Sequence, residues 1–243
     1  MSNDTLFIAD LHLDASHPEI TQQFLSFLQT TASHADALYI LGDLFEVWVG
    51  DDDNDPHHQQ VMQALHELTQ SGIDTYLMHG NRDFLIGEVF ARQTGITLLP
   101  DPVIVDVYNH PVLLMHGDLL CTDDTDYQQF RAMVREPQWQ QQFLSLALEE
   151  RYKIARNYRQ QSQAASSQKS ETIMDVAQTT VEQYLQEFQT PYLLHGHTHR
   201  PGLHEFMLDN VARTRIVVGD WYTQGSVLKW NSSGFDLQSL PRN

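Results

Sequence analysis

Five short apolar segments of the sequence are each followed by polar side chains that could bind a metal ion. These side chains lie in Asp10-Leu-His12, Gly42-Asp43, His79-Gly-Asn-Arg-Asp83, His116-Gly-Asp118 and His195-Gly-His-Thr-His199. Because residues i and i+2 of an extended segment point to the same side, Asp10 and His12 form a pair of neighbouring donors. His197 and His199 form a second such pair. The mixture of carboxylate, imidazole and amide groups suits Mn²⁺, and less well Fe²⁺, Mg²⁺ or Zn²⁺.

Each motif alone is weak evidence for a site. A single histidine after a strand is usually a core or capping residue, and Gly-Asp after a strand is usually a turn. The acidic run Asp51-Asp-Asp53 with Asp55 is likewise more typical of a solvated loop than of a metal site. The ordered recurrence of five motifs, four of them with glycines that allow sharp turns and close approach, favours one shared metal centre.

The segments that precede these motifs are predicted strands, and amphipathic helices separate them. The predicted strands are 6–9, 37–41, 76–78, 112–115, 192–194, 216–218 and 226–230, and helical spacing of apolar residues covers 20–28, 61–68 and 173–185. This alternation predicts an α/β core. Ligand sites in open α/β sheets lie beyond the carboxyl ends of the strands, so five strands would deliver the polar side chains to one edge.

Residues 125–170 interrupt this alternation with helical patterns and no strand signal. Within them, residues 160–170 are polar and rich in Ser and Gln, which predicts a loop. We therefore predict one domain that spans residues 1–243 and carries a helical insertion at 125–170. The apolar side chains of the insertion either pack on the core or line a binding site, and they include Trp139, Phe143, Leu146 and Leu148.

Charge is unevenly distributed along the chain. The net charge of −18 argues against nucleic acid as a partner, because phosphate backbones attract basic surfaces. Seven of the 14 basic residues nevertheless fall within 131–169, namely Arg131, Arg135, Arg151, Lys153, Arg156, Arg159 and Lys169. Such a cluster indicates an anionic substrate or an anionic membrane surface, or else a solvated helix face.

The sequence also bears on the compartment. It contains no apolar run long enough to span a membrane, and its first residues lack the pattern of a signal peptide. Cys121 is the single cysteine, so no internal disulfide can form. We expect a cytoplasmic protein in a reducing environment.

Taken together, the motifs resemble the calcineurin-like metallophosphoesterase superfamily over almost the whole chain. Within it, Leu41-Gly-Asp-Leu-Phe-Glu-x-Trp48, His79-Gly-Asn-Arg-Asp-Phe84, Met115-His-Gly-Asp118 and Cys121-Thr-Asp-Asp124 are similar to the family of UDP-2,3-diacylglucosamine pyrophosphatases. The resemblance implies a sandwich of two mixed sheets flanked by helices, with the insertion as a lid. It also implies Mn²⁺-dependent hydrolysis of UDP-2,3-diacylglucosamine to 2,3-diacylglucosamine 1-phosphate (lipid X) and UMP, in lipid A biosynthesis.

The resemblance implies roles for individual residues. One Mn²⁺ would be held by Asp10, His12, Asp43 and His199, and a second by Asp43, Asn81, His116 and His197, with Asp43 bridging. The catalytic residues would be Asp43, Asn81, Arg82 and His116. Contacts to substrate would come from Asn81, Arg82, Asp124, Ser162, Ser166, Lys169 and His197, although Ser166 stands where the family can have Asn. His79 and His195 would be neighbours of the site and not ligands.

Arg82 departs from the wider superfamily, many members of which have histidine after the asparagine. Arginine cannot act as a general acid near neutral pH, but it can hold a phosphate in a bidentate fork. A nucleotide phosphate needs little protonation to leave, since its second pKa is about 6. Arg82 therefore favours cleavage of a pyrophosphate between two metal ions, unless it is a structural residue paired with Asp83.

Two other functions remain open. A different two-metal phosphodiesterase or nucleotide phosphatase would use the same ligands, because fold and metals tolerate many substrates. A metal-free scaffold of this fold would have lost ligand positions, yet all seven are present. For the favoured function we expect a monomer without an obligate protein partner, peripherally associated with the anionic cytoplasmic face of the inner membrane.

Overall fold

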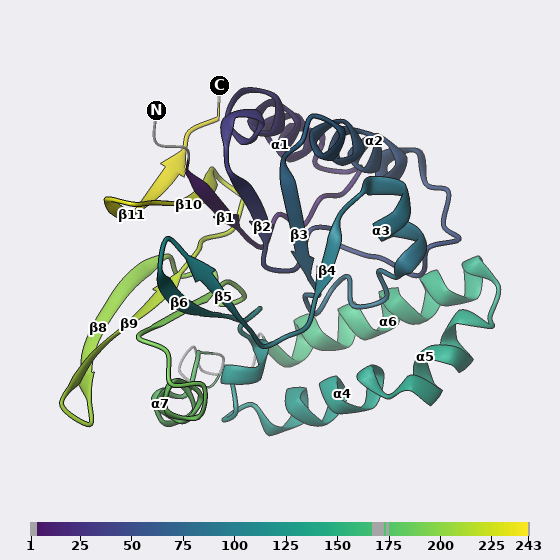
Figure 1. Cartoon of the computed structure of the whole chain (residues 1–243). Coiled ribbons are helices and arrows are strands. Elements are labelled where there is room, and N and C mark those ends of the chain that lie inside the picture. The colour runs from purple at the N-terminus through teal and green to yellow at the C-terminus, as the bar shows by residue number, and fades with distance from the viewer. Residues whose placement is uncertain (1–3, 167–172, 174, 243) are drawn as a thin grey trace.

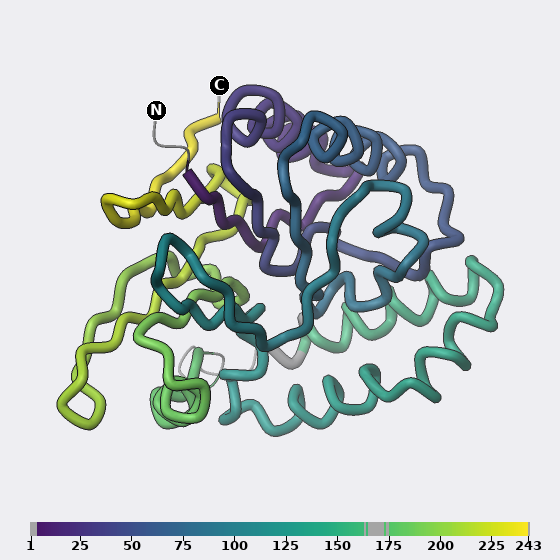
Figure 2. Tube along the Cα trace, in the orientation of Figure 1, coloured from purple at the N-terminus to yellow at the C-terminus, as the bar shows by residue number. Residues whose placement is uncertain are grey.

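The computed structural model describes residues 4–166, 173 and 175–242, and its strands form two sheets (Figure 1). Figure 2 shows the course of the chain in the same orientation. The first sheet has the order β11-β10-β1-β2-β3-β4, in which β1 to β4 are parallel and β10 pairs antiparallel with both β1 and β11. Its strands are β1 (Thr5–Ile8), β2 (Ala37–Ile40), β3 (Asp74–Met78), β4 (Thr97–Leu99), β10 (Gly225–Asn231) and β11 (Gly234–Leu240).

The second sheet has the order β5-β6-β7-β9-β8, in which β6, β7 and β9 are parallel and the two edge strands pair antiparallel. Its strands are β5 (Val103–Val107), β6 (His110–Leu114), β7 (Tyr192–His195), β8 (Gly202–Leu208) and β9 (Val211–Val217). The β8–β9 hairpin projects from one side of the molecule (Figure 1).

The two sheets pack face to face and helices cover their outer faces. Phe7, Leu114 and Leu194 belong to the cluster between the sheets, whereas Leu6 and Ile8 face the cluster under the helices of the first sheet. These helices are α1 (Pro18–Thr30), α2 (Pro56–Gln70) and α3 (Glu88–Thr94), and α7 (Gln178–Glu187) covers the second sheet. Strands buried on both faces are continuously apolar, as the sequence shows. The predicted sandwich of two mixed sheets flanked by helices is confirmed.

Residues of the predicted insertion form three helices along the lower side of the first sheet (Figure 1). They are α4 (Thr125–Arg135), α5 (Pro137–Leu144) and α6 (Leu148–Ser166). The prediction of a loop at 160–170 was wrong up to Ser166, because α6 continues through residues 160–166. That stretch contains Gln, Ala and Ser but no Gly or Pro, so nothing in it ends a helix.

Several elements have no clear sequence signal. The sequence analysis did not predict β4, β5, β8, β11 or α3, and the helix expected over 173–185 begins only at Gln178. The five strands expected to share one edge are divided between the sheets, three in the first and two in the second. No helix in the described ranges is both long and apolar enough to cross a bilayer.

Candidate metal centre

The loops that leave the five strands adopt an unusual backbone conformation. Five of the seven expected ligands have a positive φ: Asp10 (54°), His12 (50°), Asp43 (53°), His197 (68°) and His199 (55°). Residues other than glycine rarely occupy this region, and strain of about 1–3 kcal/mol each persists only where the surroundings enforce it. Five of the ten non-glycine residues with a positive φ in the described part of the chain are therefore expected ligands.

Backbone hydrogen bonds and glycines hold these loops against one another. Asp10 N–H donates to Gly42 O at 3.1 Å, and His12 N–H donates to Asp43 O at 2.9 Å. A Cβ at Gly80 would collide with the Asp43 carboxylate, and one at Gly196 would collide with that of Asp10. The close approach of the loops therefore requires glycine at both positions.

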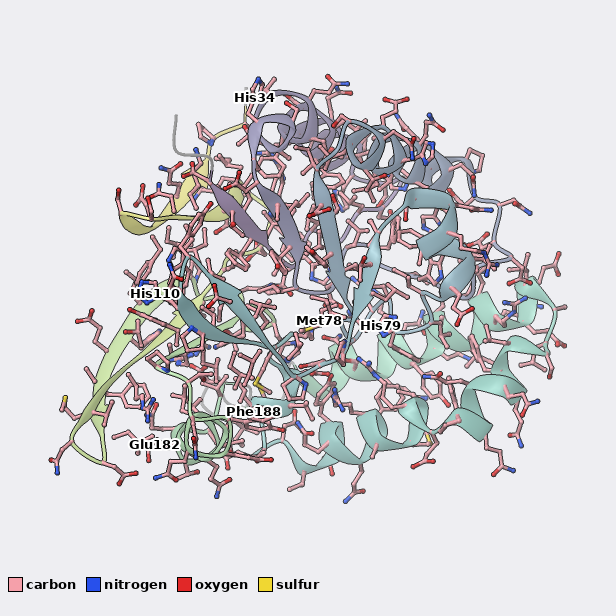
Figure 3. All side chains as sticks on the ribbon, in the orientation of Figure 1. His34, Met78, His79, His110, Glu182 and Phe188 are labelled. Atoms are coloured by element: carbon pink, nitrogen blue, oxygen red, sulfur yellow. The ribbon has the colours of Figure 1, made fainter. Side chains whose placement is uncertain are left out.

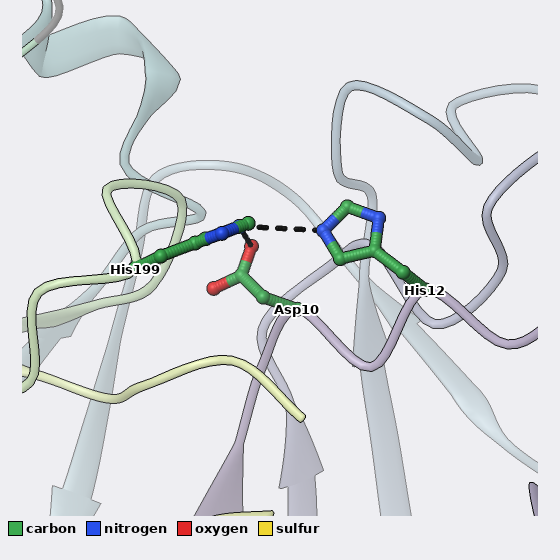
Figure 4. Close-up of side chains that lie close together, drawn as sticks. All are labelled: Asp10, His12 and His199. Atoms are coloured by element: carbon green, nitrogen blue, oxygen red, sulfur yellow. Dashed lines mark hydrogen bonds and ion pairs between the residues drawn. The ribbon is translucent and has the colours of Figure 1, made fainter. Parts of the chain in front are cut away.

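Asp10, His12 and His199 form one half of the centre. His12 Nε2 lies 3.3 Å from His199 Nε2, and His199 Nε2 lies 3.5 Å from Asp10 Oδ1. Figure 4 shows the His12 ring and the Asp10 carboxylate both facing His199. The three ligand atoms lie within 4.8 Å of one another, which is close enough for one ion to contact them all.

Asn81, His116 and His197 form the other half. Asn81 Oδ1 lies 3.1 Å from His116 Nε2 and 3.0 Å from His197 Nδ1. The Asp43 carboxylate stands between the halves, with Oδ2 at 3.7 Å from His12 Nε2 and 3.9 Å from His116 Nε2. This is the place that a ligand bridging two ions would occupy.

Burial and charge in the centre fit a cation. Asp10 Oδ1 is buried and makes no hydrogen bond within the part of the chain that the structure describes. Burial acts to raise the pKa of Asp10, but His199 and the other imidazoles lower it to about 2. Burial, together with His116, lowers the pKa of His197 to about 4, so this imidazole is neutral and can donate a lone pair.

His79 and His195 make other contacts. His79, at the end of β3 (Figure 3), places Nε2 2.7 Å from Ile86 O. His195 is fully buried, with Nδ1 2.7 Å from Gly196 O and Nε2 3.2 Å from the Arg215 guanidinium. Neither belongs to a cluster of potential metal ligands within the described residues.

The family model for calcineurin-like phosphoesterases matches residues 4–201. This chain belongs to the calcineurin-like phosphoesterase family. It is therefore a hydrolase of a family that uses a dinuclear metal centre. Two clusters of potential ligands agree with this, one of Asp10, His12 and His199 and one of Asp10, Asp43 and His116.

The relatives of this phosphoesterase match it over its length. A UDP-2,3-diacylglucosamine hydrolase of Stenotrophomonas maltophilia (strain K279a) is 51% identical over 245 residues, covering 98% of this chain and 99% of the relative. One of Serratia proteamaculans (strain 568) is 49% identical over 238 residues, with the same coverage. A solved archaeal phosphodiesterase has a TM-score of 0.50 at 11% identity, covering 98% of this chain and 99% of that one, and shows the fold alone.

Arg82 of the phosphoesterase is not paired with Asp83. Asp83 instead accepts hydrogen bonds from the backbone N–H groups of Gly80 at 2.8 Å and Leu44 at 2.7 Å. Arg82 Nε is buried and has no hydrogen-bond partner among the described residues. The prediction of an Arg82–Asp83 pair is therefore wrong among the described residues.

A cavity of about 100 Å³ adjoins Asn81 and Arg82 between the core and helices α4 to α6. Its aromatic lining comprises Trp48, Phe84, Tyr127, Phe130, Trp139, Tyr158 and Phe143. Ser162 also lines it, whereas Leu146 and Leu148 do not. The phosphoesterase thus places an apolar pocket directly beside its metal centre.

The other expected substrate contacts lie elsewhere. Asp124 caps α4, where its carboxylate accepts the Tyr127 N–H at 3.1 Å, and it does not line the cavity. Ser166 is the last residue of α6, but its side chain lies outside the described part of the chain. Lys169 also lies outside the described residues.

Most of the basic residues of 131–169 face the core. Arg131 Nε donates to Asp118 at 2.7 Å, Arg135 donates to Gly80 O at 2.8 Å, and Arg151 forms two hydrogen bonds with Asp52. Arg159 forms an ion pair with Glu46. The interpretation of this cluster as a solvated helix face is therefore wrong for these four residues. They join the helices to carboxylates and carbonyls of the core.

Sequence reasoning missed two residues of the phosphoesterase centre. Tyr222 stacks on His12 with ring centroids 5.1 Å apart and an interplanar angle of 10°. Glu46 Oε2 lies 2.8 Å from His12 Nδ1. Glu46 stands three residues after Asp43 in the motif Leu41–Trp48, so its only sequence signal was its position near a predicted ligand. Tyr222 had no sequence signal, because it lies outside the five motifs on a loop far along the chain.

Proposed function

We propose that this phosphoesterase hydrolyses the pyrophosphate bond of UDP-2,3-diacylglucosamine to 2,3-diacylglucosamine 1-phosphate and UMP. The observation that carries the proposal is the apolar cavity that shares Asn81 and Arg82 with the metal centre. A lipid with a pyrophosphate headgroup needs an apolar pocket for its acyl chains beside a metal centre for its phosphates. The names of full-length relatives about 50% identical to this chain support the same substrate.

The proposed metals are two Mn²⁺ ions. Asp10, His12 and His199 would hold one ion, Asn81, His116 and His197 would hold the other, and Asp43 would bridge them. When bound, the ions would neutralise phosphoryl oxygens and activate a water molecule for in-line attack at phosphorus. Manganese is proposed because it accepts this mixture of oxygen and nitrogen ligands.

The side chains of the chain itself would bind and orient the substrate. Arg82 would hold the UMP phosphate, which leaves without needing a general acid. Asn81 and His197 would contact the scissile group, and Asp124, Ser162, Ser166 and Lys169 the sugar and its phosphate. Ligand pockets usually enclose about 300–1,000 Å³, so the cavity of about 100 Å³ must widen to admit acyl chains.

Because the cavity has to widen, the helices of residues 125–170 that line it have to move. We propose that they form a lid within a single domain of residues 1–243, and that this lid moves when lipid enters. The exposed side chains of Met133 and Leu144 on these helices, 41% each, would rest against an anionic lipid surface. The enzyme would work as a monomer at the cytoplasmic face of the inner membrane, without nucleic acid or an obligate protein partner.

The test is phosphorus NMR of metal-depleted protein given Mn²⁺ and UDP-2,3-diacylglucosamine in ¹⁸O-enriched water. We expect release of UMP that requires Mn²⁺. Labelled oxygen will identify the phosphorus that is attacked. Brisk cleavage of a simple phosphodiester without turnover of this lipid would instead support another two-metal phosphodiesterase or nucleotide phosphatase.

Arg82→Lys separates the two functions further. Lysine keeps the charge but cannot form a bidentate fork. We expect kcat/KM for the lipid to fall about 10–100-fold, the equivalent of one charged hydrogen bond of about 1.5–3 kcal/mol. Arg92→Lys, on the exposed surface of α3, is the matched control and should change nothing. An equal rate for Arg82→Lys would contradict the role of the fork.

A further inference from the structure

Glu46 connects the metal centre to the lid. Glu46 lies in the core loop after β2 and is 9% exposed. Its Oε2 atom is 2.8 Å from His12 Nδ1, on the side of the ring opposite the metal centre. Its Oε1 atom forms an ion pair with Arg159 of α6. A single carboxylate therefore touches both an expected metal ligand and the longest helix of the lid.

The Glu46 carboxylate faces Nδ1 of His12 at ion-pair distance, although the two groups are not aligned for a hydrogen bond. A carboxylate beside Nδ1 favours the tautomer that carries its proton there, which presents the lone pair of Nε2 to a metal and makes that lone pair more basic. Tyr222 stacks on the face of the same ring. Stacking restrains the plane of the ring, whereas the charge of Glu46 favours one tautomer. Among the described residues, the Glu46 carboxylate is the ion-pair partner of His12 Nδ1.

We propose that Glu46 is a positioning residue that orients His12 for metal binding and links metal binding to docking of α6 through Arg159. This inference rests on the metal sites proposed above. Arg159 also lines the cavity beside Arg82, so an anionic group of the substrate can draw it from Glu46. Arg159 then no longer offsets the negative charge of Glu46 beside His12. Linkage requires that metal binding affect α6 docking by the same factor.

A purely structural role for Glu46 makes a different prediction. If Glu46 only held Arg159, its loss would loosen α6 and leave metal affinity unchanged. If it only oriented His12, its loss would weaken metal binding and leave α6 unchanged. The proposal requires both effects, and it requires that they depend on each other.

The experiment uses the full chain with Mn²⁺ alone and compares Glu46→Gln with wild type. Calorimetry should show a loss of about 10–100-fold in Mn²⁺ affinity at one of two sites, the usual cost of removing such a partner. The electron paramagnetic resonance spectrum of the bound manganese should change with it. In wild type, saturating Mn²⁺ should slow amide hydrogen exchange in α6, and in Glu46→Gln it should not.

Two further variants complete the test. Arg159→Gln should abolish the effect of Mn²⁺ on α6, and the double variant should bind Mn²⁺ no more weakly than Glu46→Gln, because Arg159 acts through Glu46. Glu150→Gln, an exposed change on the same helix, is the control and should behave as wild type. It also checks that replacing a carboxylate near α6 has no general effect.

The outcomes separate this inference from the proposed function. Wild-type protein that binds no Mn²⁺ would overturn the proposed metal sites themselves. Wild-type protein that binds two ions, together with Glu46→Gln of equal affinity, would overturn only the inference. The same holds if α6 exchange in wild type is indifferent to Mn²⁺.

Discussion

The candidate metal centre and helices α4 to α6, the proposed lid, are held in place by different forces. Asp10, Asp43 and His116 are at most 2% exposed, and their loops are cross-linked by backbone hydrogen bonds. In α6, by contrast, Arg151 is the only buried residue among those whose side chains are described. In α4, Val134 is the only buried residue. Ion pairs and a thin layer of partly buried apolar contacts attach these helices to the core.

This difference indicates how the protein divides its tasks. Ligands must be held within fractions of an ångström, which buried backbone achieves. The proposed lid would have to open for a lipid, and few of its described side chains are buried against the core to oppose opening. Local stability should therefore be high at the strand ends and low in α4 to α6.

Asp43→Ala should produce the largest effect on activity and leave helices α4 and α5 in place. It removes the carboxylate that faces both halves of the centre, so we expect kcat/KM to fall roughly a thousandfold or more. Hydrogen exchange in α4 and α5 should stay unchanged, since among the described residues no hydrogen bond or ion pair joins Asp43 to them. Asp74→Ala, on the exposed start of β3, is the control. Faster exchange in α4 or α5 of Asp43→Ala would show that these helices depend on the metal centre.

Arg151→Met should produce the opposite pattern. Arg151 donates to Asp52, Val49 O and Leu146 O, and its loss leaves the buried Val49 carbonyl without this donor. We expect exchange in α6 to rise about 10–100-fold, as for one or two lost hydrogen bonds of a charged group. Mn²⁺ affinity should stay within a factor of two or three of the wild-type value.

Lys153→Met is the matched control for that change, because Lys153 is an exposed cation on the same helix. It should leave exchange in α6 as in wild type. If Arg151→Met weakened Mn²⁺ binding as strongly as it loosened α6, the lid would prove to be part of the metal centre.

Asp101→Asn should have the smallest effect and reports on the contact between the regions. Burial, with a contribution from Asp118, raises the pKa of Asp101 to about 6, although Arg131 of α4 lies 3.6 Å away. The folded protein therefore binds this proton more tightly than the unfolded chain, and ionisation of Asp101 costs stability as pH rises from about 4 to 6.

Thermal unfolding measures that cost. At pH 7.5 the Asn variant should unfold at a temperature about 2–4 °C higher, which corresponds to about 1 kcal/mol for a chain of this size. The difference should vanish below about pH 3, where Asp101 is protonated in both the folded and the unfolded state. A variant that is less stable at pH 7.5 would mean that the ion pair with Arg131 outweighs the burial of the carboxylate.

Much of the core was predictable because its signals are local. Apolar runs with polar ends marked β1, β2, β3, β6 and β7, since a strand buried on both faces is apolar at every position. The strands β8 and β11 consist mostly of exposed and partly buried residues, so burial did not require an apolar residue at every position. The C-terminal end of α6 was missed because Gln and Ser are common in loops and are also tolerated in helices.

The sequence by itself determined the types, order and spacing of the expected ligands, because those are properties of short segments of chain. Only the tertiary structure decided that the ligand-bearing strands belong to two sheets, that Asp83 binds backbone amides and not Arg82, and that the lid cations are paired with core carboxylates. Each of these depends on which distant segments meet in space. Glu46 and Arg159 are 113 positions apart, and no local pattern records that their charges are in contact.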